Sequence, residues 1–550
     1  MSISTFQNKA NRSKSHMEKY TVIDLFAGAG GLSYGFLQTG KFRLVAAAEI
    51  NVNAQATYKA NIADDVPGFV FIDNVIGYNF SKLSEELGGI DIVIGGPPCQ
   101  GFSNANRQKN HLISMNNGLV KEYFRAIKEI QPLAFVMENV SMLRSDTHRF
   151  YESHKDNTEI EALIENGYSI PKRLDSVLVA TDRFAGIDYE QVESLDIDAL
   201  SLPADLKQLL SVLNKNKNNP RRLPNYMAKH RTEIITQIDT YIAQIENPNV
   251  AQQHTRRCLR IVRDAVDANN VELCIDELDE IIKMQKMLST LREIRQNELI
   301  GTYRTTEAGA LYFDVRSYSV IDYINAILGD EYVQDGCTVN AEWYGVPQER
   351  RRYIVMGVRK NAFKKEKISM PVAPENITLL TVGDAISDLQ SYDACYAPKH
   401  TEMPYHVDDQ LSNYATSMRA NSTGVNNHIT TKTTDVALKR FRAIPQGKNF
   451  HSLDTSLKDT YSKPERTQNT IYLRLDPTKP SGTVVNVRKS MWIHPALDRA
   501  ITVREAARLQ SFPDRFIFEG SKDSQYQQVG NAVPPLLAEG IAYKVLDNLN

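Results

Sequence analysis

A cysteine in a proline-restricted loop is the first residue whose surroundings suit covalent chemistry. Cys99 lies in Gly95-Gly-Pro-Pro-Cys-Gln-Gly-Phe-Ser103, where two prolines fix the backbone just before the thiol. A rigid loop that presents a thiol is what a nucleophile requires. A lone cysteine is more often a small buried hydrophobe. We keep that interpretation for the remaining four, Cys258, Cys274, Cys337 and Cys395.

Two charged segments could act together with this thiol. Glu138, in Glu138-Asn139-Val140, directly follows the apolar run 134–137. A carboxylic acid and a thiol at neighbouring strand ends can act on one substrate from two sides. Gln348-Glu-Arg-Arg-Arg352 precedes another apolar run, 353–358. Taken alone, Glu138 equally suits a helix cap or a salt bridge, and the arginine-rich segment equally suits a solvated turn.

A glycine-rich turn near the start of the chain indicates a nucleoside site. Asp24-Leu-Phe-Ala-Gly-Ala-Gly-Gly31 follows an apolar run, and its glycines let the backbone approach a ligand closely. The pattern is not GxGxxG and no Walker lysine follows, so a nucleoside without phosphates is favoured over a phosphate. Glu49 ends the next apolar run, where an acidic residue can accept hydrogen bonds from a ribose diol. The alternative is a simple tight turn.

The elements that position these residues predict an α/β fold. Apolar runs at 20–26, 44–50, 90–94 and 134–137 read as buried strands, and 119–130 has helical periodicity. This alternation predicts a doubly wound, Rossmann-like parallel sheet, whose ligands lie beyond the carboxyl ends of the strands. Further helices are expected from apolar stripes, and their ranges are 234–245, 278–291, 503–509 and 535–546.

Composition bounds the class of protein. The chain has 550 residues, of which 42% are hydrophobic, and its formal net charge is -2, so global charge gives no hint of nucleic acid. No apolar run of 18 or more residues predicts a membrane span. The five cysteines are far apart and form no CxxC pair, which argues against a disulfide framework or a zinc site and suits a reducing cytoplasm. Residues 1–19 are expected to be a disordered leader.

Six segments in this order resemble the motif set of the DNA (cytosine-5) methyltransferase family. They are the glycine-rich turn, the Cys99 loop, Glu138-Asn139-Val140, the Arg350–Arg352 segment, Arg504-Glu-Ala-Ala-Arg-Leu-Gln-Ser-Phe-Pro-Asp514 and Gln528-Val-Gly-Asn-Ala-Val-Pro-Pro535. The resemblance covers about 20–145 and 320–548. About 210 residues separate Glu138 from Gln348, several times the usual length in the family.

The resemblance implies a base-flipping enzyme that uses S-adenosylmethionine. Cys99, Glu138 and Arg352 would surround the cytosine, and Arg350 would brace Glu138. Gln100, Ser103, Thr483 and Arg488 are candidate DNA contacts. The predicted cofactor site consists of Asp24, Phe26, Ala27, Gly28, Gly30, Gly31, Glu49, Ile50, Asp73, Pro97, Leu119, Asn531 and Val533.

Sequence recognition is expected in a region whose local charge differs from the global one. Residues 425–495 contain twelve Lys and Arg residues against five Asp and Glu residues, a basic surface suited to DNA. The predicted domains are the leader 1–19, a catalytic domain over 20–154, 316–360 and 496–550, a helical insertion over 155–315 and a target-recognition domain over 361–495. Within the insertion a basic run is either a solvated loop, a phosphate clamp or part of a surface for a protein partner; its members are Lys215, Lys217, Arg221, Arg222, Lys229 and Arg231.

These observations predict a cytoplasmic, prokaryotic modification enzyme that methylates carbon 5 of cytosine in double-stranded DNA. We expect it to act as a monomer, without a membrane, and either alone or beside a restriction enzyme or defence partner. Two alternatives stay open. One is a tRNA cytosine-5 methyltransferase, disfavoured by Gly101-Phe102-Ser103 and by the long segment 361–495. The other is a non-catalytic DNA-binding regulator, disfavoured because Cys99 and Glu138 are both present.

Overall fold

The computed structural model describes residues 19–64, 66–98, 116–139, 149–220, 222–397, 402–407, 409–461 and 464–550. The chain divides into two compact units. The catalytic unit contains 1–99, 116–145 and 328–550, and the insertion unit contains 100–115 and 146–327. All but Lys19 of the expected leader lies outside the described residues. None of the helices in the described part of the chain is long and apolar enough to cross a membrane.

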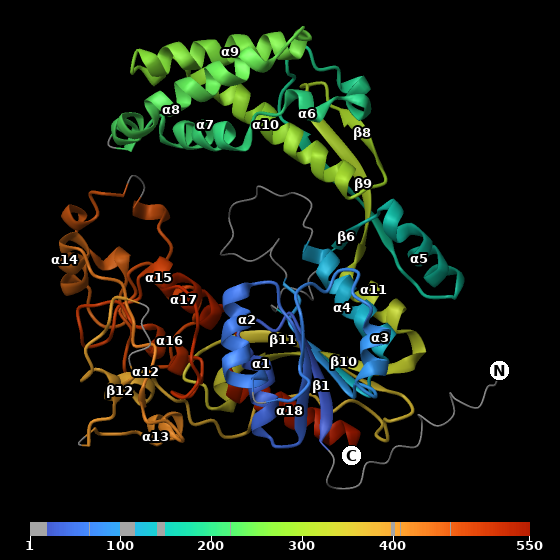
Figure 1. The fold of residues 1–550 in the computed structure, drawn as a ribbon, viewed down its shortest axis with the longest axis vertical. Coiled ribbons are helices and arrows are strands. Elements are labelled where there is room, and N and C mark those ends of the chain that lie inside the picture. The colour runs from blue at the N-terminus through green and yellow to red at the C-terminus, as the bar shows by residue number, and fades with distance from the viewer. Residues whose placement is uncertain are drawn as a thin grey trace. The chain divides into compact units, whose positions relative to one another are not determined.

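Seven strands of the described residues form the central sheet of the catalytic unit, in the order β10-β11-β5-β4-β1-β2-β3 (Figure 1). The strands β1, β2, β4, β5 and β11 are largely buried on both faces, as expected for a sheet covered by helices, whereas the edge strands β10 and β3 are only partly buried. The order runs outward in both directions from β1 and β4, which creates a topological switch point between these two strands. The strands are β1 Tyr20–Leu25, β2 Phe42–Ala48, β3 Val70–Ile72, β4 Ile92–Gly95, β5 Ala134–Asn139, β10 Tyr332–Asn340 and β11 Arg351–Arg359.

The predicted doubly wound sheet is confirmed, but one strand runs against the others. β11 pairs antiparallel with both β5 and β10, whereas β1 to β5 pair in parallel. Only residues 341–350 connect β10 to β11. This connection is too short for a parallel crossover, which needs a dozen or more residues. The reversal brings the start of β11, with its arginines, beside the end of β5.

Helices cover this sheet, and a further set builds the C-terminal part of the unit. α1 packs against α18, and α3 against α4. Trp492, Phe512, Phe516 and their neighbours form a separate buried core among α12, α13, α16 and α17. Two short strands, β12 Met403–Pro404 and β13 Gly424–Val425, pair within this region. The helices are α1 Gly31–Gln38, α2 Val52–Tyr58, α3 Phe80–Glu86, α4 Asn116–Ile130, α12 Val382–Ile386, α13 Asn413–Arg419, α14 Asp435–Ala443, α15 Val487–Ser490, α16 Val503–Leu509, α17 Lys522–Asn531 and α18 Pro535–Leu549.

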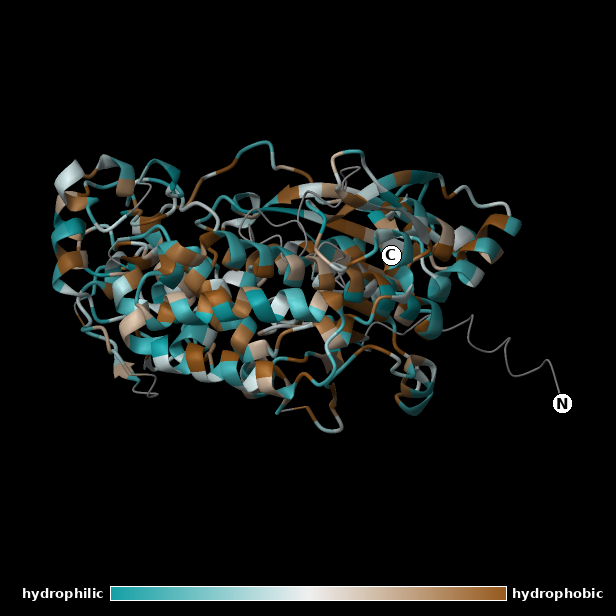
Figure 2. Ribbon diagram, turned by 90° about the horizontal axis from the view of Figure 1, so that it is seen from above, coloured by the Kyte–Doolittle hydropathy of each residue, from teal (hydrophilic) through white to brown (hydrophobic). Residues whose placement is uncertain are grey.

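The insertion unit is mainly helical, with apolar and polar stretches alternating along its helices (Figure 2). Its helices are α5 His154–Glu165, α6 Ile197–Leu200, α7 Ala204–Asn216, α8 Arg222–Gln244, α9 Val250–Asp267, α10 Ile275–Gln296 and α11 Val320–Leu328. It also contains an antiparallel sheet of β6 Arg149–Tyr151, β7 Lys172–Ala180, β8 Gly301–Thr305 and β9 Leu311–Ser319. Helical periodicity predicted α8 and α10, but β7 and β8 were not expected.

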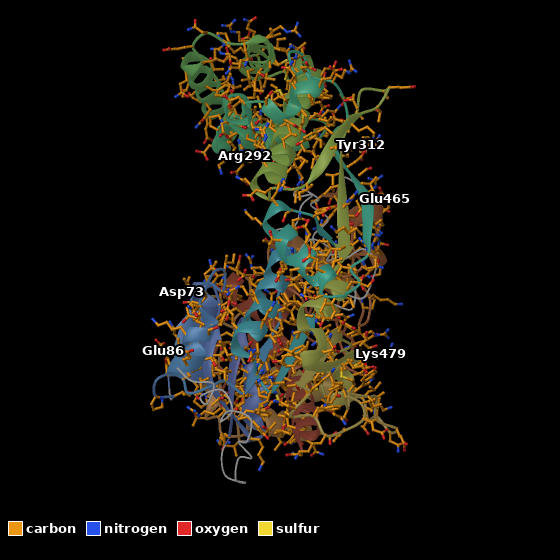
Figure 3. All side chains as sticks on the ribbon, turned by 90° about the vertical axis from the view of Figure 1, so that its right-hand side faces the viewer. Asp73, Glu86, Arg292, Tyr312, Glu465 and Lys479 are labelled. Carbon is orange, nitrogen blue, oxygen red and sulfur yellow. The ribbon has the colours of Figure 1, made fainter. Side chains whose placement is uncertain are left out.

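Two apolar cores stabilise the insertion unit. One joins β7 and β9 to the second half of α10, on which Arg292 lies (Figure 3). The other joins α7, α8 and α9 to the first half of α10. α10 therefore contributes to both cores, which explains why it is buried along most of its length.

Candidate active site

The carboxyl ends of β1 and β2 form the predicted cofactor edge of the sheet. Glu49 follows β2, and its carboxylate accepts hydrogen bonds from the backbone N–H of Gly28 at 2.9 Å and of Asn51 at 2.7 Å. The backbone N–H of Ala27 donates to the carbonyl of Ala48 at 2.9 Å. The glycine-rich turn and the acidic residue are thus locked together by hydrogen bonds.

Three residues of the glycine-rich turn, Phe26, Gly28 and Gly31, show where its backbone is constrained and where it is open. Phe26 adopts φ 62°, a left-handed conformation uncommon for a residue with a side chain. A Cβ added to Gly31 would lie 2.2 Å from the carbonyl oxygen of Val533, so only glycine allows this close approach. A Cβ added to Gly28, by contrast, would meet nothing within 4 Å. The turn is therefore packed on one side and open at Gly28, as a ligand cradle requires.

Asp24 lies beneath this turn and is fully buried. Its carboxylate accepts a hydrogen bond from the Ser33 hydroxyl at 2.5 Å, and that hydroxyl lies 2.7 Å from the hydroxyl of Tyr58. Burial raises the pKa of Asp24 to about 7, the Ser33 hydrogen bond opposes the rise and the charge of Glu49 adds to it. Asp24 therefore acts as a support for the turn from below.

The remaining predicted cofactor residues lie at several places in the catalytic unit. Ile50 is 74% exposed, an unusual position for a large apolar side chain beside a carboxylate. Asp73 follows β3 (Figure 3), and its carboxylate accepts from the Gln55 amide at 3.1 Å. The same amide donates to the carbonyl of Glu49, which links two strand ends. The others lie at the end of β4, the start of α4 and the end of α17, and they are Pro97, Leu119, Asn531 and Val533.

Glu138 and Arg352 form an ion pair where β5 and β11 meet. The Nε of Arg352 lies 2.7 Å from Oε1 of Glu138, and the two side chains are only 15% and 13% exposed. A Cβ on Gly96 would lie 3.1 Å from Oε2 of Glu138, so the carboxylate passes directly over the start of the cysteine loop. An acid and a cation thus lie together at the strand ends, and both belong to the set of residues that the sequence analysis placed around the cytosine.

The predicted bracing of Glu138 by Arg350 is wrong, because Arg352 holds that carboxylate. The side chain of Arg350 is buried and donates to two backbone carbonyls, those of Val484 at 2.9 Å and Gly530 at 3.1 Å. Residues two apart share a face in a regular strand, but Arg350 precedes β11, so its side chain does not have to follow that of Arg352. Arg350 therefore ties three distant segments of the unit together.

Asn139 is a positioning residue that the sequence analysis did not assign. It is 4% exposed, and its amide donates a hydrogen bond to the carbonyl of Pro97 at 3.1 Å. The residue next to Glu138 thus holds the loop that leads to the predicted nucleophile. Its place in Glu138-Asn139-Val140 was the available signal. Cys99, Gln100 and Ser103 lie outside the described residues.

The two candidate DNA contacts in the described region have protein partners. The hydroxyl of Thr483 donates to the carbonyl of Glu349 at 2.9 Å, and Arg488 pairs with Asp523 at 2.6 Å on the surface. Gln348 is fully buried, accepts from the backbone N–H of Val484 at 2.7 Å and donates to the carbonyl of Leu509. The bonds of Thr483 and Val484 join the predicted target-recognition region to the segment just before β11.

The arginines of α16 have a structural role. Arg508 is fully buried and pairs with Asp514 at 2.6 Å and with Asp388 at 2.7 Å. Arg504, also fully buried, donates to the carbonyls of Asn426, Pro513 and Phe516. Buried charges are tolerated only when paired and hydrogen-bonded in this way. The fifth motif is therefore the frame on which the C-terminal region is built.

The strand order, the glycine-rich turn after β1 and the acidic residue after β2 define a Rossmann-like methyltransferase fold. A solved structure of a prophage-encoded protein of E. coli, described as a DNA modification methyltransferase, has a TM-score of 0.53 and 20% identity. The match covers 97% of this chain and 100% of that one. This likeness supports the fold.

Sequence comparison defines the family. The model of the C-5 cytosine-specific DNA methylases matches residues 20–182 and 322–547. The DNA (cytosine-5-)-methyltransferase M.ApeKI of Aeropyrum pernix is 26% identical over 97% of this chain and 100% of its own length. The type II methyltransferase M.DdeI of Desulfomicrobium norvegicum is 33% identical over 42% of this chain and 60% of its own length. The chain belongs to the C-5 cytosine-specific DNA methylase family and is a DNA (cytosine-5-)-methyltransferase.

Proposed function

We propose that the enzyme methylates carbon 5 of a flipped-out cytosine in a specific double-stranded DNA sequence, using S-adenosylmethionine and a covalent adduct at Cys99. The observation that carries this proposal is the partly buried Glu138–Arg352 ion pair, whose carboxylate passes over Gly96 at the start of the cysteine loop. Residue types for acid–base and electrostatic catalysis thereby meet at one edge of the sheet, beside the loop whose sequence leads to Cys99.

The cofactor edge fits an uncharged nucleoside with a charged tail. Open space at Gly28 allows close approach, Glu49 offers carboxylate oxygens to a ribose diol, and the exposed Ile50 offers an apolar surface to a base. When bound, S-adenosylmethionine supplies an electrophilic methyl group. The chain's own residues have to hold that group beside carbon 5 and exclude water from it.

The proposed chemistry begins with the thiolate of Cys99, which adds to carbon 6 of cytosine. The addition places electron density on carbon 5, which would then take the methyl group as the methyl–sulfur bond of the cofactor breaks and S-adenosylhomocysteine leaves. Removal of the proton from carbon 5 and breakage of the carbon 6–sulfur bond regenerate the thiolate and the aromatic ring. The target base has to leave the duplex for any of these steps, at a cost of a few kcal/mol.

Glu138 and Arg352 have complementary roles in this scheme. Glu138 donates a proton or a shared hydrogen bond to ring N3, which makes carbon 6 more electrophilic. Arg352 holds Glu138 in position through its 2.7 Å contact and stabilises negative charge that develops on the O2 side of the ring. Asn139 holds the cysteine loop through the Pro97 carbonyl.

Recognition of the DNA sequence is assigned to residues 361–495 together with Gln100 and Ser103. Thr483 positions the segment before β11 through the Glu349 carbonyl, and Arg488 reaches DNA only if its surface pair with Asp523 opens. The excess of basic residues over 425–495 supports phosphate contact. Several relatives are type II methyltransferases, which supports a cytoplasmic role in modifying host DNA, alone or beside a restriction enzyme or defence partner.

A methyl-transfer assay tests the proposal. The purified chain is incubated with methyl-labelled S-adenosylmethionine and either duplex DNA or tRNA, and the modified DNA is sequenced to locate 5-methylcytosine. We expect label in DNA at one sequence, none in tRNA and none in DNA with Cys99→Ala. Label in tRNA alone identifies a tRNA enzyme, and DNA binding without transfer identifies a regulator. Either of these outcomes overturns the proposal.

A further inference from the structure

Three potential metal ligands converge in the insertion unit, far along the chain from the catalytic motifs. His254 and Cys258 lie on α9, and Glu280 lies on α10. The Nε2 of His254 is 2.8 Å from Oε1 of Glu280 and 3.5 Å from the Sγ of Cys258. The sulfur is 3.9 Å from the other oxygen of Glu280. One thiol, one imidazole nitrogen and one carboxylate therefore face a common point.

The helix geometry explains how these side chains meet. Residues four apart lie on the same face of a helix, so His254 and Cys258 project together from α9. α9 and α10 pack against each other, and Glu280 lies one turn into α10. The set thus spans two helices, and its ligand spacing in the sequence matches none of the common CxxC patterns.

The separations match a tetrahedral metal site. With bonds of about 2.3 Å to sulfur and about 2.0–2.1 Å to nitrogen, tetrahedral angles place these two ligand atoms about 3.5 Å apart. The Sγ–Nε2 distance is 3.5 Å. The carboxylate needs a shift of about 0.5 Å to reach the corresponding separation from nitrogen, and a glutamate side chain can make this shift by rotation alone.

Charge and access also suit a divalent cation. A thiolate and a carboxylate carry two negative charges, which balance one divalent ion beside a neutral imidazole. Cys258 is 1% exposed, whereas the side chains of His254 and Glu280 are 18% and 36% exposed. Glu280 also lines a cleft of about 300 Å³ that contains Asp182, Asp276 and Asp279. Arg183 and Lys283 also line this cleft, whereas His254 and Cys258 do not. An ion therefore reaches the site through the partly exposed side chains of His254 and Glu280.

We propose that His254, Cys258 and Glu280 bind one divalent metal ion, and that Zn²⁺ fits best because it accepts sulfur, nitrogen and oxygen together. Ala251 of α9 and Met284 of α10 belong to one apolar core of the unit. Cys258 of α9 and Ile281 of α10 belong to the other. The ion would therefore cross-link the two helices where the cores meet. This role is independent of methyl transfer.

Metal binding is tested on the full-length chain carrying Cys99→Ala, so that the predicted nucleophile binds no metal. The protein is titrated with Zn²⁺, and with Co²⁺ as a spectroscopic probe, and the bound metal is counted. We expect one ion per chain, a thiolate-to-cobalt charge-transfer band, and release of protons on binding. Bound metal should also raise the melting temperature.

Matched variants separate this site from other ligands. Cys258→Ser should abolish the charge-transfer band, and Glu280→Gln, at a partly exposed position, should weaken Zn²⁺ binding by about tenfold or more. Cys274→Ser removes a second buried cysteine of the same unit, and it should change neither the charge-transfer band nor the affinity for Zn²⁺. Absence of bound metal, or equal binding by Cys258→Ser and the parent, would overturn the proposal and leave a hydrogen-bonded His–Glu pair beside a buried thiol. Circular dichroism checks that each variant is folded.

Discussion

The catalytic unit and the insertion unit differ in where their charged side chains lie. In the catalytic unit, Arg504, Glu505, Arg508 and Asp514 are fully buried; both arginines pair with Asp514, and Glu505 pairs with Arg499. In the insertion unit the two cores are almost entirely apolar, and most ion pairs lie at the surface, such as Arg292 with Asp198.

This difference shows what each unit requires of its sequence. Removing one partner from a buried ion pair costs about 3–5 kcal/mol, whereas an exposed pair contributes about 0–1 kcal/mol. The catalytic unit therefore depends on particular residues that hold loops in fixed positions. The insertion unit depends on a pattern of apolar residues that many sequences satisfy. Substituting a single charged residue should therefore change stability or activity more in the catalytic unit than in the insertion unit.

The largest effect is expected at Glu138. Glu138→Gln keeps the shape of the side chain but removes the acid, so kcat should fall by about 10²–10⁴-fold. DNA affinity should change only a few-fold, because N3 protonation matters mainly in the transition state. Single-turnover methylation and a binding titration measure the two quantities. Glu349→Gln, at an exposed carboxylate nearby, is the control. A parallel loss of affinity and rate would count against the assigned role.

Substitutions of Arg350 and Arg352, at the start of β11, should affect different quantities: the free energy of unfolding for Arg350 and kcat for Arg352. Arg352→Gln should lower kcat by about 10²–10³-fold without unfolding the protein. Arg350→Met should instead lower the free energy of unfolding by about 3 kcal/mol, since each buried carbonyl left unpaired costs about 1–3 kcal/mol. Arg351→Gln, at a side chain 67% exposed, should change neither quantity.

Urea unfolding and steady-state kinetics on the three variants measure these effects. A stable Arg350→Met protein with low kcat would show that Arg350 acts on the substrate rather than on the fold.

Asp24 should make stability depend on pH in the opposite direction from most carboxylates. Its pKa rises from 3.8 when unfolded to about 7 when folded, so its favourable contribution is present below pH 4 and is lost as the pH rises through 7. His428 and His494 oppose this trend, because burial lowers both of their pKa values to about 4. The wild-type profile alone is therefore not diagnostic.

The diagnostic quantity is the stability of wild type relative to Asp24→Asn, measured by urea unfolding between pH 5 and 8 without cofactor. This difference should fall by a few kcal/mol, on the order of 1.4 kcal/mol per pH unit, as the pH rises. A difference that stays constant over this range would show that Asp24 does not titrate there.

The smallest effect is expected in the basic run of the insertion unit. Lys217 pairs with Asp279, and Arg231 with Asp267, so these two are poor phosphate ligands. Lys215, Arg222 and Lys229 are exposed. Changing these three to Gln should flatten the slope of log affinity against log salt by about one to three, as each phosphate contact contributes about 0.9. Arg221 lies outside the described residues.

Lys217→Gln is the control in the same run and should leave the slope unchanged. An unchanged slope in the triple variant as well would favour a solvated loop or a surface for a protein partner.

The fold and the catalytic edge were largely predictable because their signals are local. β1, β2, β4, β5 and β11 each contain an apolar run that is visible in the sequence, and Glu49 and Glu138 directly follow such runs. Contacts between distant segments were not predictable in this way. The sequence spacing of Arg350 and Arg352 does not show which one reaches Glu138, since that depends on the antiparallel pairing of β11 with β5. Likewise, His254 and Glu280 meet only because two helices pack together.

The most direct test of the account uses DNA in which cytosine is replaced by 5-fluorocytosine. Fluorine cannot leave carbon 5 as a proton does, so the reaction should stop with DNA joined to Cys99. With S-adenosylmethionine, the wild-type chain should form a complex that survives denaturation, and peptide mapping should place the bond at Cys99. Cys99→Ala should bind the cofactor but form no complex. Methylation of normal DNA without any covalent complex, or turnover by Cys99→Ala, would contradict the proposed mechanism.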